Sequence, residues 1–310
     1  MRALLVVNPH ATSTTARRRE VIARALRSEL DLEVVQTRYR GHACQVSRAA
    51  TESGYGLVVA LGGDGTVNEA INGILSALTP PGAAVPALAT VPGGNANVFS
   101  HALGLPADPV EATGQILTAL AEGRRRKIGV GLAGDRYFCF NAGLGLDAEV
   151  VRAVEGMRTL GQSASAALYL SAAVRQFFLV TDRRHPALSV ERDGQAEVAD
   201  LFCGMVSNTS SWTYLGRRPV RASPQAGFDT GLDLLGLRKL STFGTLNTVR
   251  QMLSERAAPV RGRYVVNLHD SSELVFRASR PVAFQVDGEY VGERECVTFR
   301  AIPHALQVVA

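Results

Sequence analysis

Residues 57–75 read LVVALGGDGTVNEAINGIL, and this stretch decides the fold. The apolar run 57–60 predicts a short buried strand, and the pattern from Asn68 onward predicts a helix. The glycines between them, Gly62, Gly63 and Gly65, let the backbone turn tightly and approach a ligand. The N-terminus of the following helix offers N–H groups and a positive dipole end, which suit a phosphate.

The acidic residue Asp64 lies inside this glycine turn. A carboxylate would repel phosphate unless a metal ion lies between them, so Asp64 indicates Mg²⁺–nucleotide chemistry or a catalytic role. The alternative is a turn residue that caps the following helix. Thr66 can cap the helix or face a phosphate, while Asn68 and Glu69 suit the helix dipole as well as a ligand. The turn lacks the ending of a Walker loop and the spacing of a Rossmann fingerprint.

Short apolar runs alternate with helical patterns over the first part of the chain. Strands are predicted at 4–7, 32–36, 57–60 and 87–91, and helices at 15–29, 43–51, from 68, 96–103 and 109–122. This alternation predicts a parallel α/β sheet, in which ligands bind at the carboxyl ends of the strands. Asn8, Thr37, the turn at 62–66 and the turn at 93–95 all follow strand ends, so we expect them around one nucleotide.

The pattern changes after the basic run 124–127. Strand-like runs dominate the remainder, and one helical interval near residues 149–179 interrupts them. We therefore predict that the second part is an antiparallel β domain, sandwich-like in its architecture.

Six sequence blocks, in order, resemble the diacylglycerol kinase catalytic family, which includes bacterial lipid kinases and sphingosine kinases. They occupy residues 8–12, 37 with 41–43, 62–73, 91–99 with 103–106, 141–147 and 286–289. The resemblance covers nearly the whole chain. It implies an α/β ATP-binding domain, NAD-kinase-like, over residues 1–126, joined by residues 302–310. A β-rich lipid-substrate domain would occupy residues 127–301.

The resemblance implies an ATP- and Mg²⁺-dependent kinase. Such an enzyme transfers the γ-phosphoryl group to the hydroxyl of diacylglycerol or a related lipid alcohol, giving phosphatidic acid or an analogue for phospholipid biosynthesis. A carboxylate near that hydroxyl can take its proton. The resemblance assigns this role to Glu289, with Asp287 as its helper. Without the resemblance, Asp287-Gly288 indicates a hairpin turn.

The remaining ligand contacts are also implied by the resemblance. The expected nucleotide contacts are Asn8, Pro9, Thr12, Thr37, Gly62, Gly63, Gly65, Thr66, Asn68, Glu69, Gly94 and Asn95. The expected metal ligands are Asp64, Asp229 and Asp233. Two of these interpretations have a structural alternative, because Asn8-Pro9 is equally a turn and the spacing of Asp229 and Asp233 is shifted from the family pattern.

Two other functions stay open. A kinase that phosphorylates NAD also carries a Gly-Gly-Asp-Gly-Thr turn, although the Asn-Pro loop and the Val67-Asn68-Glu69 continuation favour a lipid acceptor. A catalytically weak protein that binds nucleotide or lipid is the other alternative. Asn95 and Val98 motivate it, because the family has Thr and Asp at these positions.

The composition limits which classes of binding partner we expect. The 310 residues suffice for two domains, and 33 Lys and Arg against 28 Asp and Glu give a net charge of +5. This charge fits anionic ligands or an anionic membrane surface. Aromatic residues do not alternate with a basic stripe, so we expect no nucleic-acid partner. A homodimer is compatible with the sequence.

The sequence shows no signal-peptide pattern and no apolar run long enough to cross a bilayer. Its four cysteines are scattered and form no zinc-ligand spacing with the six histidines. We expect a cytoplasmic protein with reduced cysteines. A lipid kinase of this kind would contact the membrane peripherally to reach its substrate.

Overall fold

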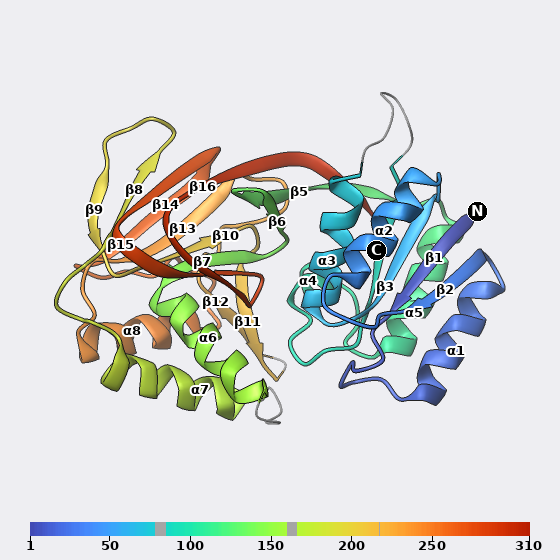
Figure 1. The fold of residues 1–310 in the computed structure, drawn as a ribbon, viewed down its shortest axis with the longest axis horizontal. Coiled ribbons are helices and arrows are strands. Elements are labelled where there is room, and N and C mark those ends of the chain that lie inside the picture. The colour runs from blue at the N-terminus through green and yellow to red at the C-terminus, as the bar shows by residue number, and fades with distance from the viewer. Residues whose placement is uncertain (78–84, 160–165, 217) are drawn as a thin grey trace. The chain divides into compact units, whose positions relative to one another are not determined.

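The computed structural model describes residues 1–77, 85–159, 166–216 and 218–310 (Figure 1). The chain divides into two compact units. Unit 1 comprises Met1–Ile128 and His304–Ala310, and unit 2 comprises Gly129–Pro303. The division lies two residues after the predicted boundary between residues 126 and 127. Residues 304–310 belong to unit 1.

Unit 1 is a parallel α/β unit, as predicted. Its sheet has the strand order β2–β1–β3–β4, with β1 (Arg2–Val7), β2 (Asp31–Gln36), β3 (Leu57–Gly62) and β4 (Ala87–Pro92). Val308, near the C-terminus, pairs with Leu88 in β4. Every residue of β3 and β4 is buried, which explains their largely apolar sequences.

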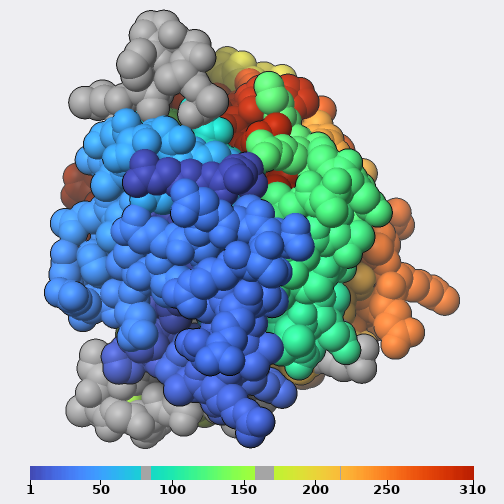
Figure 2. Space-filling view, turned by 90° about the vertical axis from the view of Figure 1, so that its right-hand side faces the viewer, coloured from blue at the N-terminus to red at the C-terminus, as the bar shows by residue number. Residues whose placement is uncertain are grey.

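Five helices accompany this sheet in the described part of unit 1. They are α1 (Ala16–Arg27), α2 (His42–Glu52), α3 (Asp64–Leu75), α4 (Val98–Ala102) and α5 (Pro109–Ala121). Figure 2 shows this unit in space-filling form, with α1 in blue against α5 in green. The side chains of Thr15 and Asp108 accept hydrogen bonds at the starts of α1 and α5, so local caps fix both helix starts.

Helix α3 begins four residues earlier than predicted. Gly63 is its N-cap residue in an extended conformation, so Asp64, Gly65 and Thr66 form the first helical turn. The glycines do not form a long loop before the helix. They bring the helix start directly to the end of β3.

Unit 2 is built on an antiparallel sheet, which agrees with the predicted β-rich second domain. Its central strand order is β14–β13–β10–β7–β15–β16, and β8, β9, β5 and β6 pair at its margins. The described strands are β5 (Arg126–Ala133), β6 (Arg136–Phe138), β7 (Asn141–Gly145), β8 (Leu188–Arg192), β9 (Val198–Leu201), β10 (Cys203–Ser207), β11 (Ser211–Leu215), β12 (Arg218–Arg221), β13 (Leu232–Leu237), β14 (Val265–Ser271), β15 (Glu273–Val286) and β16 (Glu289–Val308). β11 and β12 form a separate two-stranded sheet.

Aromatic side chains fill the core of unit 2. The ring of Phe299 meets those of Phe138, Phe276 and Phe284 edge-on, at centroid distances of 6.2, 5.5 and 6.2 Å. This geometry is the favoured one for aromatic pairs, and it ties β6, β15 and β16 together.

The helices of unit 2 differ from the prediction. The interval near 149–179 contains α6 (Leu146–Thr159), α7 (Ala166–Arg175) and the π-helix η1 (Gln176–Val180), while residues 160–165 lie outside the described ranges. The prediction of a single helical interval was wrong, because α8 (Thr242–Met252) follows β13. Phe243 and Leu246 of α8 are exposed while Thr248 and Met252 are buried, so most of its large apolar side chains lie on the exposed face, unlike the usual amphipathic pattern.

Within the described ranges, no helix is both long and apolar enough to cross a membrane.

Gly73 allows α3 to approach α2 closely. A Cβ on Gly73 would lie 2.3 Å from the carbonyl oxygen of Cys44 and 2.9 Å from Cβ of Ser47. A Cβ on Gly114, in α5, would meet no other atom within 4 Å. The two glycines therefore differ in packing while sharing a helical environment.

We predict opposite effects of alanine at these two glycines. Gly73→Ala should lower the free energy of unfolding by about 1–3 kcal/mol, because the added methyl group forces two helices apart. Gly114→Ala should raise it by about 0.5–1 kcal/mol, because alanine favours the helix. Urea unfolding followed by circular dichroism measures both changes. Stabilisation by both substitutions would contradict the close helix packing.

Candidate functional site

Two glycine turns meet at the carboxyl edge of the unit 1 sheet. The N–H of Gly93, after β4, donates to the carbonyl of Gly62, at the end of β3, over 2.8 Å. A Cβ on Gly94 would lie 2.7 Å from Cα of Gly63, and one on Gly93 would lie 3.1 Å from Cα of Gly62. The two turns therefore touch backbone to backbone, and side chains on these residues would separate them.

The loop after β1 joins the same cluster. Nδ2 of Asn8 donates to Oγ1 of Thr66 over 3.2 Å, and Oγ1 of Thr12 donates to Oδ1 of Asn95 over 2.9 Å. The backbone N–H and Oγ of Ser13 donate to the carbonyls of Gly93 and Gly94, at 2.9 and 2.8 Å. Four predicted nucleotide contacts from three loops are thus brought together.

Pro9 and Thr37 follow the carboxyl ends of β1 and β2, at the same edge of the sheet. The carbonyl of Pro9 accepts a hydrogen bond from Arg19 at 3.3 Å, and the N–H of Thr37 donates to the carbonyl of Val7 at 2.8 Å. Both residues are half-buried. Their predicted contacts with a nucleotide stay predictions.

The two acids of the glycine motif bind the starts of neighbouring helices. Oδ1 of Asp64 accepts from the N–H of Phe99, in α4, at 3.2 Å. The carboxylate of Glu69 accepts from the N–H groups of Gly41 and Ala43, at the start of α2, at 2.7 and 3.1 Å. A carboxylate at a helix N-terminus satisfies N–H groups that lack helical partners and complements the dipole. Glu69 is therefore primarily a cap of α2, an arrangement that the sequence did not reveal.

Helix α3, like α2, begins after a glycine N-cap residue. Its N-cap residue is Gly63, which has no side chain to cap the helix. Asn68, one turn further, is 1 % exposed and receives a hydrogen bond from Nδ2 of Asn72 at 3.2 Å. A helix start of this kind binds anions through its first N–H groups. Asn68 supports the helix from inside the unit.

In unit 2, Asp287 and Gly288 form the predicted hairpin turn. Both have positive φ, 47° and 74°, and they join Val286 to its paired residue Glu289. Asp287 is 3 % exposed, and its carboxylate accepts from the N–H groups of Cys139, Phe140 and Asn141 at 2.7, 3.0 and 3.1 Å. Burial raises the pKa of Asp287 despite these hydrogen bonds. This carboxylate holds the segment that leads into β7.

Glu289 begins β16 directly after the turn. Its Oε2 accepts a hydrogen bond from Arg136, in β6, at 2.6 Å. The two side chains keep 19 % and 24 % of their surface exposed. Glu289 is thus held in one orientation by a guanidinium and remains partly accessible, unlike Asp287.

Asp147 is a buried carboxyl group that sequence reasoning did not assign. Nε2 of the buried Gln285 donates to Oδ2 of Asp147 at 2.7 Å and to Oδ1 of Asn141 at 2.9 Å. Oδ1 of Asp147 has no hydrogen-bond partner among the residues that the structure describes. Burial raises the pKa of Asp147 to about 6, against the lowering effect of the hydrogen bond from Gln285. The available signal was an acid at the end of the 141–147 block, where β7 meets α6.

Asp229 and Asp233 lie in different surroundings, and their predicted role as metal ligands stays a prediction. Asp233 is buried, with Oδ1 2.7 Å from Nδ1 of His269 and 3.0 Å from the N–H of Asp270, while Asp229 is exposed. Burial raises the pKa of Asp233. Over the described part of the chain, no three His, Cys, Asp or Glu side chains are grouped so as to hold a metal ion.

We predict a pH-dependent contribution of Asp147 to stability. The folded protein keeps a proton on Asp147 up to about pH 6, whereas the unfolded chain loses it near pH 4, so this contribution is full below about pH 4 and is lost as the pH rises through about 6. The free energy of unfolding of the wild type minus that of Asp147→Asn should fall by on the order of 3 kcal/mol across this range. Urea unfolding at several pH values measures it. Asp135→Asn, which removes a carboxylate at an exposed turn, is the control variant.

Comparison with known proteins places this geometry in a family. The sequence profile of the diacylglycerol kinase catalytic domain matches residues 2–133. A protein of Chromohalobacter salexigens named "Probable lipid kinase YegS-like" is 30 % identical over 274 residues, which cover 87 % of this chain and 81 % of that protein. A diacylglycerol kinase of Staphylococcus carnosus is 25 % identical over 298 residues, covering 94 % of this chain and 90 % of its own.

A solved structure of a diacylglycerol kinase from Bacillus anthracis has the same two-part fold. It superimposes with a TM-score of 0.69 at 20 % sequence identity and covers 99 % of this chain and 96 % of its own. The fold, the extent of the sequence match and the order of the motifs agree, and the chain belongs to the diacylglycerol kinase catalytic family.

Proposed function

We propose that this protein is an ATP- and Mg²⁺-dependent lipid kinase. It would transfer the γ-phosphoryl group of ATP to the hydroxyl of diacylglycerol or a related lipid alcohol, giving phosphatidic acid or an analogue. Family membership and the names of the relatives support a lipid kinase. The observation that carries the proposal is the contact of two glycine turns beside the uncapped start of α3.

The unit 1 cluster supplies the phosphate site in this proposal. Phosphoryl transfer depends mainly on positioning and on stabilising negative charge, and preformed N–H groups provide both. The turns at 62–66 and 93–95 present backbone close to a ligand, because no Cβ stands between them. Asn8, Thr12, Thr66 and Asn95 add polar side chains that their mutual hydrogen bonds hold in place.

Asp64 is the residue that would hold Mg²⁺. This ion usually binds through one or two carboxylates together with substrate phosphates and water, so a larger protein cluster is not required. Bound there, Mg²⁺ would neutralise charge on the transferred phosphoryl group. Asp64 stands in the first turn of α3, beside the proposed phosphate site. Asp233 is less suited, because His269 already contacts its carboxylate.

Glu289 is the proposed proton acceptor. Its carboxylate is partly exposed and is oriented by Arg136, so it can meet a hydroxyl group. Asp287 is better suited to positioning than to proton transfer, because it is buried and accepts three backbone hydrogen bonds. It would act by fixing the hairpin that carries Glu289.

Glu289→Gln should retain ATP binding and lose turnover by at least roughly 100-fold, because the amide cannot accept the proton. The measurement is transfer of radiolabelled γ-phosphate, with Mg²⁺, to mixed micelles of diacylglycerol, ceramide, sphingosine or monoacylglycerol, and to NAD in parallel. Glu293→Gln is the matched control. It lies on the same strand, is exposed and pairs with Arg152, so its turnover should match the wild type.

The outcomes separate the alternatives. Label in a lipid that disappears only in Glu289→Gln supports the proposal and identifies the acceptor. Label in NAD instead of lipid would establish the NAD kinase alternative. ATP binding without transfer to any acceptor would favour the binding protein that Asn95 and Val98 suggest.

Gly94→Ala should weaken the binding of a non-hydrolysable ATP analogue by about tenfold or more, because its methyl group would push the two glycine turns apart. Isothermal titration calorimetry measures the affinity, and circular dichroism checks that the variant folds. Gly114 lies in the middle of α5 with open space around it, so Gly114→Ala should bind the ATP analogue with the affinity of the wild type. Unchanged affinity of a folded Gly94→Ala would place the nucleotide elsewhere.

A further inference from the structure

Two segments of unit 2 expose large apolar side chains. At the end of η1 these are Phe178, Leu179 and Val180, with Leu179 77 % exposed. Along α8 they are Phe243, Leu246 and Val249, with Phe243 88 % exposed. The α8 residues recur at every third position, so they form one stripe along the helix. A contiguous apolar surface of this kind marks an interaction site.

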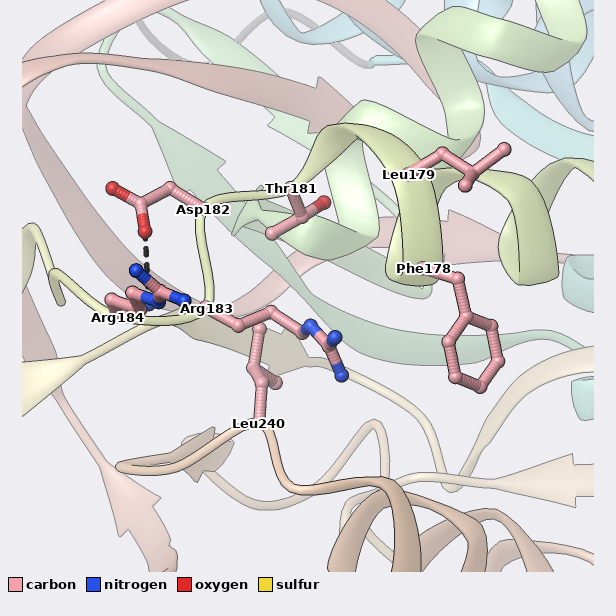
Figure 3. A pocket seen from close by; sticks show the side chains of 7 residues that line it. All are labelled: Phe178, Leu179, Thr181, Asp182, Arg183, Arg184 and Leu240. Atoms are coloured by element: carbon pink, nitrogen blue, oxygen red, sulfur yellow. Dashed lines mark hydrogen bonds between the residues drawn. The ribbon is translucent and has the colours of Figure 1, made fainter.

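A hollow in the protein surface lies beside the end of η1 and beside a residue that precedes α8. A cavity of about 410 Å³ is lined by Phe178 and Leu179 from η1, by Thr181, Asp182, Arg183 and Arg184 from the segment that follows, and by Leu240 (Figure 3). Leu240 stands two residues before α8 begins. Leu240 itself is buried. We call the surface formed by the exposed residues 178–180, 243, 246 and 249 the η1–α8 surface.

Basic residues are concentrated in the two chain segments that carry the η1–α8 surface. Segments 174–184 and 238–263 contain nine Arg and Lys but only two Asp and Glu, whereas the rest of the chain has 24 basic and 26 acidic residues. The positive net charge of the protein therefore resides in these two segments. The guanidinium of Arg183 stacks over the rings of Phe177 and Phe178, at 4.8 and 5.6 Å. Lys239 and Arg263 similarly lie over Tyr264, at 5.2 and 5.4 Å.

We propose that the η1–α8 surface docks this protein on an anionic lipid bilayer. Its apolar side chains would enter the interfacial region, while the Arg and Lys of the same two segments would contact anionic headgroups. Charge complementarity selects this partner. A second copy would bring two strongly basic surfaces together, which costs free energy. The proposal rests on the proposed function only for the choice of a lipid as partner.

The test uses the full chain without ATP or substrate. Flotation with vesicles of phosphatidylcholine, alone or mixed with phosphatidylglycerol, measures partitioning. The wild type should bind the mixed vesicles more strongly than the neutral ones, and added salt should weaken that binding. The double variants Phe243→Ser with Leu246→Ser, and Arg238→Glu with Lys239→Glu, should each reduce partitioning by roughly tenfold or more. All four residues are exposed, so the fold should persist.

Matched controls lie on α1 in unit 1. Val21→Ser removes an apolar side chain that is 47 % exposed, and Arg17→Glu reverses an exposed charge. Both should float with the vesicles as the wild type does. Equal loss in these controls would show that the effect is not specific to the η1–α8 surface, and would overturn the proposal.

Three further outcomes would overturn the proposal. The wild type could fail to bind mixed vesicles, or both double variants could bind them normally. Light scattering could instead show a dimer that both double variants convert to a monomer, which would assign the surface to a second copy. Vesicle binding without phosphate transfer would contradict only the proposed function. Activity on a monomeric short-chain diacylglycerol without vesicle binding would contradict only the docking proposal.

Discussion

The backbone contact between the two glycine turns is the constraint on which the rest of unit 1 depends. A Cβ on Gly94 would stand 2.7 Å from Cα of Gly63, so this edge of the sheet closes only if both residues lack side chains. The contact places the start of α3 next to the turn after β4. The loop after β1 then attaches through Ser13, whose hydrogen bonds reach Gly93 and Gly94. Residues far apart in sequence thereby present one compact polar surface.

The acidic residues of the motifs mainly accept hydrogen bonds from backbone N–H groups. Asp64 and Glu69 accept hydrogen bonds from the first turns of α4 and α2, and Asp287 accepts three from the segment before β7. Charge-assisted hydrogen bonds to N–H groups are stronger than neutral ones, so each carboxylate stabilises the loop that it meets. A motif acid can therefore serve packing and chemistry together. Glu289 differs, because its partner is the side chain of Arg136.

The sequence predicted what local patterns determine. Strand and helix alternation identified the parallel sheet, and the Asp287-Gly288 pair identified the hairpin. Helix α8 was not predicted because Phe243, Leu246 and Val249 face solvent, so its apolar residues do not mark the buried face. The environment of Asp147 could not be predicted either. It depends on Gln285, which is 138 positions away in the chain, and such pairings are fixed by tertiary structure. The helix caps formed by Asp64 and Glu69 could not be predicted either, because they also depend on residues that are distant in sequence.

The long strand β16 has a consequence for synthesis of the protein. It begins at Glu289 in unit 2, and its last residues belong to unit 1, where Val308 pairs with Leu88. The sheet of unit 1 therefore lacks this pairing until Val308 has been synthesised. Unit 2 has all its strands before that moment, apart from the last residues of β16. Such non-local pairing slows folding, and unit 1 cannot make all its native contacts before Val308 has been synthesised.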